Sequence, residues 1–132
     1  TSAVQRESRS GAMANILAVD DSPSIRKLVS ATLSKAGHSV ESASDGQEGL
    51  ELAEANAYDV VITDVHMPIM DGITLTENLR KLDTCRFTPI LILTTESASD
   101  MKLRGKQAGA TGWIVKPFNP ESLIKVIDRV LG

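Results

Sequence analysis

Short apolar runs alternate along this chain with segments whose apolar residues recur at helical spacing. The extended runs cover residues 15–20, 38–43, 59–64, 89–94 and 112–116. Three of them are nearly continuous stretches of Val, Ile and Leu, as in parallel strands that are covered on both faces. The run at 38–43 mixes polar and apolar residues, so we expect it at an edge of the sheet.

Helix start and stop signals separate these runs. Helices are expected to open at Ser22-Pro23, Asp45-Gly46, Asp71-Gly72, Ser99-Asp100 and Pro120. They are expected to close at Gly37, Asn56, Arg80-Lys81 and Gly109. Strand and helix alternating five times predict a doubly wound α/β domain of the (βα)5 type with right-handed crossovers.

Composition narrows the class of protein. The chain has 132 residues, a net charge of −3 and a hydrophobic fraction of 42%, as expected for one soluble domain. It has no basic run that would indicate nucleic-acid binding, and no apolar stretch near the ~20 residues of a membrane span. Cys85 is its single cysteine, which excludes an internal disulfide and fits a reducing, cytoplasmic compartment.

The first twelve residues carry no apolar period and no signal-peptide core. We expect residues 1–12 to be a disordered tail or a leftover expression tag, with Met13 as the natural start, and residues 13–132 to be the domain. A genuine N-terminal extension is the alternative.

Unusual residues gather where four of the five strands end. Asp20-Asp21, Asp64, Thr94 and Lys116 follow or close their runs, and ligands of such sheets bind beyond the carboxyl ends of the strands. Two carboxylates at ~4 Å repel each other by roughly 1 to 4 kcal/mol, so cations must be present. Lys116 supplies one charge and Mg²⁺, which binds few hard oxygen ligands, supplies the rest. Asp64 is then the candidate nucleophile for an aspartyl phosphate.

Several of the notable residues also have a simpler interpretation. Asp20 and Asp21 could cap the next helix, and Lys116 could be a surface lysine. Thr94 could be an ordinary strand-end threonine beside Thr95. Trp113 taken alone is more typical of packing than of signalling. His38 and His66 are expected to be solvated, with neither imidazole acting as a ligand.

Four motifs together resemble the receiver domain of response regulators. They are LAVDDSPSIR (17–26), DVHMPIMDG (64–72), LTTES (93–97) and GATGWIVKPFNP (109–120). The resemblance covers residues 13–132 and is greatest to single-domain chemotaxis regulators of the CheY type. It implies a flavodoxin-like, five-stranded parallel sheet of order 2-1-3-4-5. It also implies a cis peptide bond between Lys116 and Pro117.

The resemblance assigns the metal and phosphoryl roles. Asp64 matches the phosphoacceptor. Asp21, Asp64 and the backbone carbonyl of His66 match the Mg²⁺ ligands, and Asp20 would act through a metal-bound water.

The resemblance assigns the remaining site residues to switching. Thr94 and Lys116 match the groups that hold the phosphoryl group, and Thr94 with Trp113 matches the switch pair. Tryptophan is larger than the usual aromatic residue there. His66 and Glu96 are expected to tune dephosphorylation.

The implied function is a phosphorylation-operated switch and not an enzyme. A histidine kinase would phosphorylate the protein. The output would then be contact with a flagellar motor switch protein through the face formed by the fourth helix, fifth strand and fifth helix. We expect a monomer with no nucleic-acid or membrane partner, and no output segment after Gly132.

Other functions are the alternatives. A phosphorelay shuttle and a cell-cycle regulator are alternatives within the family. An aspartyl-nucleophile phosphatase would need an acid two residues past its nucleophile and a cap domain. An FMN carrier would need a phosphate loop where this chain is acidic.

Overall fold

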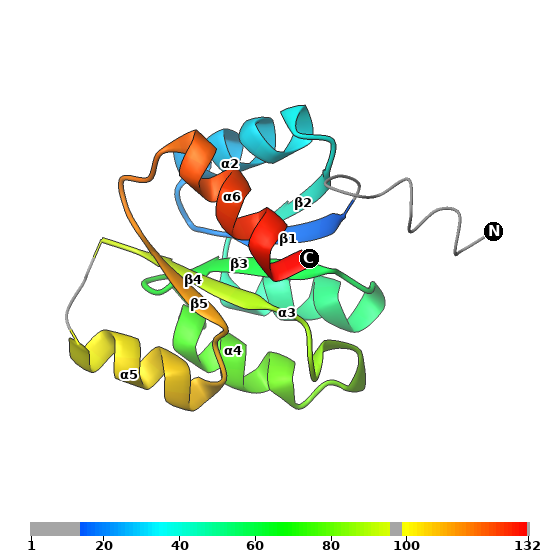
Figure 1. Ribbon diagram of the computed structural model, residues 1–132. Helices are drawn as coiled ribbons and strands as arrows, with labels where there is room; N and C mark the ends of the chain where they lie inside the picture. The colour runs from blue at the N-terminus through cyan, green and yellow to red at the C-terminus, as the bar shows by residue number, and fades with distance from the viewer. Residues whose placement is uncertain (1–13, 96–98, 132) are drawn as a thin grey trace.

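The computed structural model describes residues 14–95 and 99–131, with only the backbone for 99–101. The strands are β1 (Asn15–Val19), β2 (Ser39–Ala43), β3 (Val60–Asp64), β4 (Ile90–Thr94) and β5 (Gly112–Val115). The helices are α2 (Pro23–Lys35), α3 (Gly46–Ala55), α4 (Gly72–Arg80), α5 (Ser99–Ala108) and α6 (Pro120–Leu131). The strands form one parallel sheet in the order β2-β1-β3-β4-β5, which confirms the predicted flavodoxin-like α/β fold with β2 at an edge (Figure 1).

Helices cover both faces of the sheet (Figure 1). Side chains of alternate strand positions pack with α2 and α6 on one face. The other positions pack with α3 and α4, and towards β5 with α5. β3 and β4 are buried at every position, because helices cover both faces of these central strands. This two-sided burial is why these strands read as continuous apolar runs.

Capping contacts confirm three of the five expected helix starts, and the helices at Ser99 and Pro120 also begin where expected. The Oγ of Ser22 accepts a hydrogen bond from an N–H of the first turn at 3.3 Å, and the carboxylates of Asp45 and Asp71 do the same at 2.8 and 2.7 Å. Such caps satisfy N–H groups that have no partner within the helix. Gly37 and Gly109 follow α2 and α5 with φ of 99° and 107°, the left-handed region that favours glycine at helix ends.

Strand limits differ from the expected ones by one residue. Residues His38, Asp59 and Pro89 precede their strands, and Asp20 and Lys116 follow theirs. Apolar patterning marks where a strand is buried, whereas pairing ends where the backbone turns away. A short 3-10 helix, η1 (Asp83–Cys85), was not predicted.

His38 is buried, so the expectation of a solvated imidazole is wrong. Its exposed fraction is 5%, and its Nδ1 accepts a hydrogen bond from the backbone N–H of Ala14 at 3.1 Å. Its buried Nε2 has no hydrogen-bond partner among the residues that the structure describes. A polar residue just before an edge strand gave no signal that this ring would support the start of β1.

Arg80 joins two connections at the amino end of the sheet, the one between α4 and β4 and the one between α5 and β5. Its guanidinium donates hydrogen bonds to the carbonyls of Cys85 and Thr88 at 2.7 Å each, and to the carbonyl of Gly109 at 2.9 Å. A fork of five donors suits this task, and the sequence had indicated only a cation at a helix end. Within the described ranges, no helix has the length and apolar character needed to cross a membrane.

Candidate functional site

Three carboxylates converge at the carboxyl end of the sheet. Asp64 is the last residue of β3, and Asp20 and Asp21 follow β1, the strand that pairs with β3. One oxygen atom from each of the three acids lies within 4.8 Å of the others. Asp20 and Asp64 are 3% and 7% exposed, and Asp21 is exposed. The parallel pairing of β1 with β3 therefore builds the acidic cluster that the strand ends predicted.

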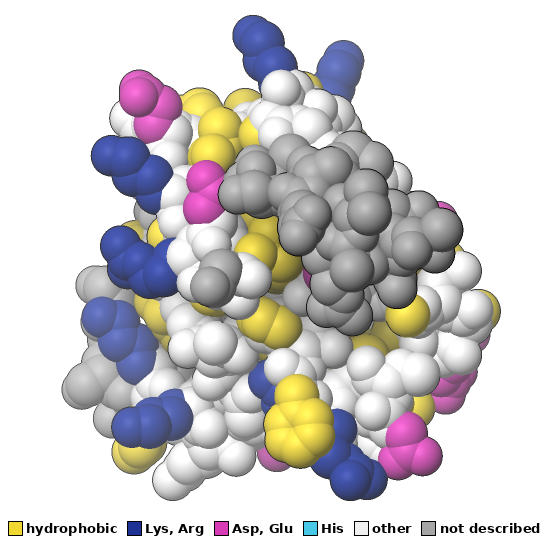
Figure 2. All heavy atoms as spheres, turned by 45° about the vertical axis from the view of Figure 1, so that its right-hand side comes forward, with side chains coloured by type: hydrophobic (Ala, Val, Ile, Leu, Met, Phe, Trp, Pro, Cys, Tyr) yellow, Lys and Arg dark blue, Asp and Glu magenta, His cyan; other side chains and the backbone are white. Residues whose placement is uncertain are grey.

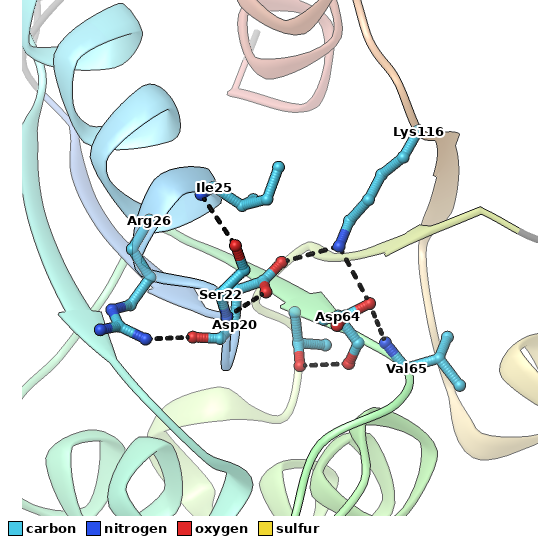
Figure 3. Close-up of polar contacts among 8 residues, drawn as sticks. Asp20, Ser22, Ile25, Arg26, Asp64, Val65 and Lys116 are labelled. Carbon is cyan, nitrogen blue, oxygen red and sulfur yellow. Dashed lines mark hydrogen bonds and ion pairs between the residues drawn. The ribbon is translucent and has the colours of Figure 1, made fainter.

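Lys116, which follows the carboxyl end of β5, extends its side chain to this cluster (Figure 3). Its Nζ lies 2.9 Å from Oδ2 of Asp20 and 3.3 Å from Oδ1 of Asp64. Three carboxylates and one ammonium leave a net charge of −2. One divalent cation would neutralise that charge. The interpretation of Lys116 as an ordinary surface lysine is wrong.

Backbone groups orient the two buried acids. Oδ1 of Asp20 accepts a hydrogen bond from the N–H of Ser22 at 2.9 Å, while its Oδ2 accepts from Lys116. Oδ1 of Asp64 accepts from the N–H of Val65 at 2.9 Å (Figure 3). Oδ2 of Asp64 accepts no hydrogen bond from the residues that the structure describes. The two oxygens of Asp20 are thus engaged, and one oxygen of Asp64 is available for chemistry.

Electrostatics make Asp64 an unusual carboxyl group. Burial raises the pKa of Asp64, the charge of Asp20 raises it further, and Lys116 and the N–H of Val65 oppose the rise. Burial lowers the pKa of Lys116, but the hydrogen bond and charge of Asp20, with those of Asp64, outweigh it, so the net shift is upward. Lys116 therefore stays protonated at neutral pH, and the ionised form of Asp64 depends on positive charge nearby.

Thr94 and Trp113 share one face of the sheet. Thr94 ends β4 and is 1% exposed, and Trp113 on β5 pairs with Ile92, two residues before Thr94. Side chains two apart on a strand point to the same face. The half-buried indole packs against the cluster of Val65, Ile73, Ile92 and Ala108.

Gly105 makes room for that indole. A Cβ on Gly105 would lie 2.8 Å from Cζ3 of Trp113. Glycine inside a helix is less favourable than alanine by about 1 kcal/mol. The structure gives it a packing reason.

The structure places two more of the predicted features of the site. The peptide bond between Lys116 and Pro117 is cis, as expected. His66 is exposed, two residues after Asp64, as expected for a solvated side chain. Glu96 lies outside the described residues, so its place in the site stays a prediction.

Sequence reasoning missed Gly72. It read this residue as a helix opener, yet a Cβ there would overlap the carbonyl oxygen of Asp64. The N–H of Gly72 also donates a hydrogen bond to the carbonyl of Val65 at 2.8 Å, which closes the loop after β3. An Asp-Gly pair following an acid at a strand end was the available signal.

The donor set fits magnesium. Carboxylate oxygens are hard ligands, and Mg²⁺ typically takes one or two carboxylates and keeps several waters. Asp21 and Asp64 can supply such oxygens next to Asp20. The cluster carries an excess of negative charge, which a bound divalent cation would neutralise.

Comparison with known proteins agrees with this geometry. Residues 16–128 match the family model described as response regulator receiver domain. The chain is 40% identical over 120 residues to Protein PilH of Pseudomonas aeruginosa, covering 91% of this chain and 99% of that protein. The structure of the Vibrio cholerae chemotaxis protein CheY4 is similar with a TM-score of 0.88 and 54% identity, covering 91% of this chain and 100% of that one.

A third similar structure contains the metal. It is the receiver domain of a sensor histidine kinase from Pseudomonas aeruginosa PAO1, with a magnesium ion coordinated in its active-site cleft. It is 30% identical, with a TM-score of 0.86, and covers 92% of this chain and 99% of that one. From its motifs, its fold and these similarities, the chain belongs to the response regulator receiver domain family, phosphoacceptor signalling modules of two-component systems rather than enzymes.

Proposed function

We propose that this protein accepts a phosphoryl group on Asp64 from a histidine kinase, with Mg²⁺ bound, and then signals by contact with a protein partner in chemotaxis. The observation that carries the proposal is the buried carboxylate of Asp64 at the end of β3, beside two further acids and Lys116.

The transfer exchanges one bond to phosphorus for another. A carboxylate oxygen of Asp64 attacks the phosphorus of a phosphohistidine, and the P–N bond breaks with its electron pair passing to the imidazole, which takes up a proton. Lys116, 3.3 Å from Asp64, and Thr94 bind the transferred oxygens. Asp21, Asp64 and the backbone carbonyl of His66 would hold Mg²⁺, which would supply further positive charge at the phosphoryl group. Water later attacks phosphorus, releasing inorganic phosphate and restoring the carboxylate.

The new charge drives the switch. A phosphoryl group adds about −1.5 to −2 charges, which competes with Asp20 for Lys116 and draws Thr94 towards Asp64. Trp113 lies on the same face as Thr94 and moves when that side chain moves. A local change of this kind can alter a distant surface. It carries a signal when the partner binds one of the two states more tightly than the other.

The surface that changes is the α5–β5–α6 face. Lys102, Lys106 and Trp113 line a surface pocket of about 230 Å³ between α5 and β5, with the segment at 110–112. Two lysines beside an indole suit an acidic partner segment that carries an apolar side chain.

Similarity supports the chemotaxis assignment. At 54% identity over the full length of the other chain, the similar structure is a chemotaxis response regulator. The output partner in this proposal is a flagellar motor switch protein, and the place of action is the cytoplasm. A pull-down with a purified motor switch protein, with and without phosphorylation, tests this part.

Intact mass spectrometry tests the phosphoacceptor itself. With acetyl phosphate and Mg²⁺, the wild type should gain the mass of one phosphoryl group and Asp64→Asn should not. Trp113 emission should follow the same reaction. If the purified wild type takes no phosphoryl group from any activated donor with Mg²⁺ present, the proposal is wrong.

Dephosphorylation is a second measurement on the same sample. We propose that His66 and Glu96 set the rate at which water reaches the aspartyl phosphate, because they lie two residues past Asp64 and Thr94. Exchange of both side chains for alanine should change the lifetime of the phosphorylated state. An unchanged lifetime would contradict this role.

A further inference from the structure

Large exposed hydrophobic side chains are scattered over this domain. On the face drawn in Figure 2, hydrophobic side chains reach the surface in several groups, and Lys and Arg side chains project at the top, the left side and the bottom. Two described residues are far more exposed than the other large hydrophobic ones: Ile69 at 80% and Phe87 at 88%. Ile69 follows β3, so it lies at the rim that carries Asp64. Phe87 precedes β4 and therefore lies at the opposite end of the sheet.

Ile69 occupies a strained turn. The N–H of Met70 donates a hydrogen bond to the carbonyl of Pro68 at 2.7 Å, which makes Ile69 the centre of a three-residue γ-turn. Its φ is 71°, the sign of the rare and strained form of that turn. Glycine and asparagine tolerate this region, whereas a β-branched side chain is strained in it. A turn chosen for stability alone would carry glycine or asparagine at this position.

The surrounding residues hold the strained turn in place. A Cβ on Gly46 would overlap the carbonyl oxygen of Met70 and lie 2.8 Å from its Cβ, so the chain after Ile69 rests directly on the start of α3. Nδ2 of Asn78 on α4 contacts Sδ of Met70 at 3.5 Å. Strain of this kind persists only where neighbouring structure determines the backbone, and it is concentrated at functional sites. Ile69 is therefore presented to solvent by a rigid frame.

The burial of Asp64 limits how a donor can approach. Asp64 is 7% exposed, and a phosphoryl group carried on a protein must reach it through the rim. The surface around that phosphohistidine then covers the exposed loop that holds His66, Pro68 and Ile69. A small donor such as acetyl phosphate needs none of this surface. Apolar area covered on docking stabilises the complex in proportion to its size.

We propose that Ile69 is an apolar docking contact for the phosphohistidine-bearing donor protein, and that it sets selectivity for protein donors over small-molecule donors. This inference rests on the phosphoacceptor function proposed for Asp64. The turn prefers glycine or asparagine, whereas contact with a protein donor needs an apolar side chain. The strained isoleucine is retained for that contact.

The test replaces Ile69 with a residue that suits the turn but not the contact. Ile69→Asn should raise the thermal midpoint by roughly 5 °C because it relieves backbone strain. Its kcat/KM for phosphoryl transfer should fall roughly tenfold when the donor is an autophosphorylated sensor histidine kinase, selected as the fastest donor to the wild type from a panel. With acetyl phosphate, its rate should stay within about twofold of the wild type, since no rim surface is covered. Ile69→Met keeps an apolar side chain and should retain most of the kinase rate.

Phe87→Ala is the matched control. It removes an equally exposed hydrophobic side chain at the other end of the sheet, so both rates should be unchanged. The inference is overturned if Ile69→Asn keeps the wild-type kinase rate, or if it loses the acetyl phosphate rate to the same extent as the kinase rate. If the wild type itself fails with acetyl phosphate, the phosphoacceptor function fails instead, so the two failures are distinguishable.

Discussion

Removal of one charge from the acidic cluster should make the metal-free protein more stable. In Asp64→Asn the amide oxygen can still accept the hydrogen bond that the N–H of Val65 donates at 2.9 Å, and the side chain keeps its shape. Lys116 keeps its contact with Asp20 at 2.9 Å. The substitution therefore changes charge with little change in packing.

The magnitude follows from the distances. With an effective dielectric constant of ~20, Asp20 within 4.8 Å repels ionised Asp64 by about 3.5 kcal/mol, and Lys116 at 3.3 Å attracts it by about 5 kcal/mol. Exposed Asp21 adds a repulsion of about 1 kcal/mol through water. These charges nearly cancel, so burial decides the sign, in agreement with the raised pKa of Asp64. Desolvation of a buried carboxylate costs several kcal/mol, only partly offset by its hydrogen bonds, which leaves a gain of roughly 2 kcal/mol for the asparagine variant.

Thermal unfolding in EDTA at pH 7 measures this difference. The midpoint of Asp64→Asn should exceed that of the wild type by roughly 8 °C. Added Mg²⁺ should raise the wild-type midpoint and narrow the gap, because a ligand of the folded state stabilises it. A variant that is no more stable than the wild type in EDTA would refute the reasoning. Asp83→Asn, at a side chain that is 93% exposed, is the control and should shift the midpoint little.

The difference should also depend on pH in a defined direction. Because the pKa of Asp64 is raised in the folded state, ionisation costs stability above that raised pKa. As pH falls through it towards the ordinary value of 3.8, folded wild type binds the proton before the unfolded chain does, and the advantage of Asp64→Asn should disappear. An advantage that is constant from pH 7 to pH 4 would contradict the electrostatic explanation.

Three further substitutions test close contacts within the fold. Gly72→Ala should destabilise the fold by roughly 3 kcal/mol or more in urea unfolding, because its Cβ would overlap the carbonyl oxygen of Asp64, and an unchanged midpoint would disprove this close approach. Arg80→Lys should cost roughly 2–4 kcal/mol in the same assay, since one ammonium cannot serve carbonyls that a guanidinium fork reaches. Gly105→Ala should shift the emission of Trp113, because the new methyl would lie 2.8 Å from the indole, and an identical spectrum would show that the two do not touch.

Some residues of the site and the core carry a local signal in the sequence, and others do not. Asp64 and Lys116 were predictable, because a hydrophobic strand that ends in a charge has few simple explanations. The caps at Ser22 and Asp71 were predictable because capping is local chemistry. His38 and Arg80 were not, since their partners Ala14 and Gly109 are far away along the chain.

Sequence by itself determined the order of strands and helices, the caps and the set of charged residues at the strand ends, because periodicity and capping depend on neighbours within a few positions. Only the tertiary structure decided which of these groups meet. The pairing of β1 with β3 brings Asp20 to Asp64, and the crossover to β5 brings Lys116 to both. The tertiary structure also decided that Gly72 and Gly105 are sites of close approach and that Ile69 is strained. These features depend on distances between segments that local sequence patterns do not encode.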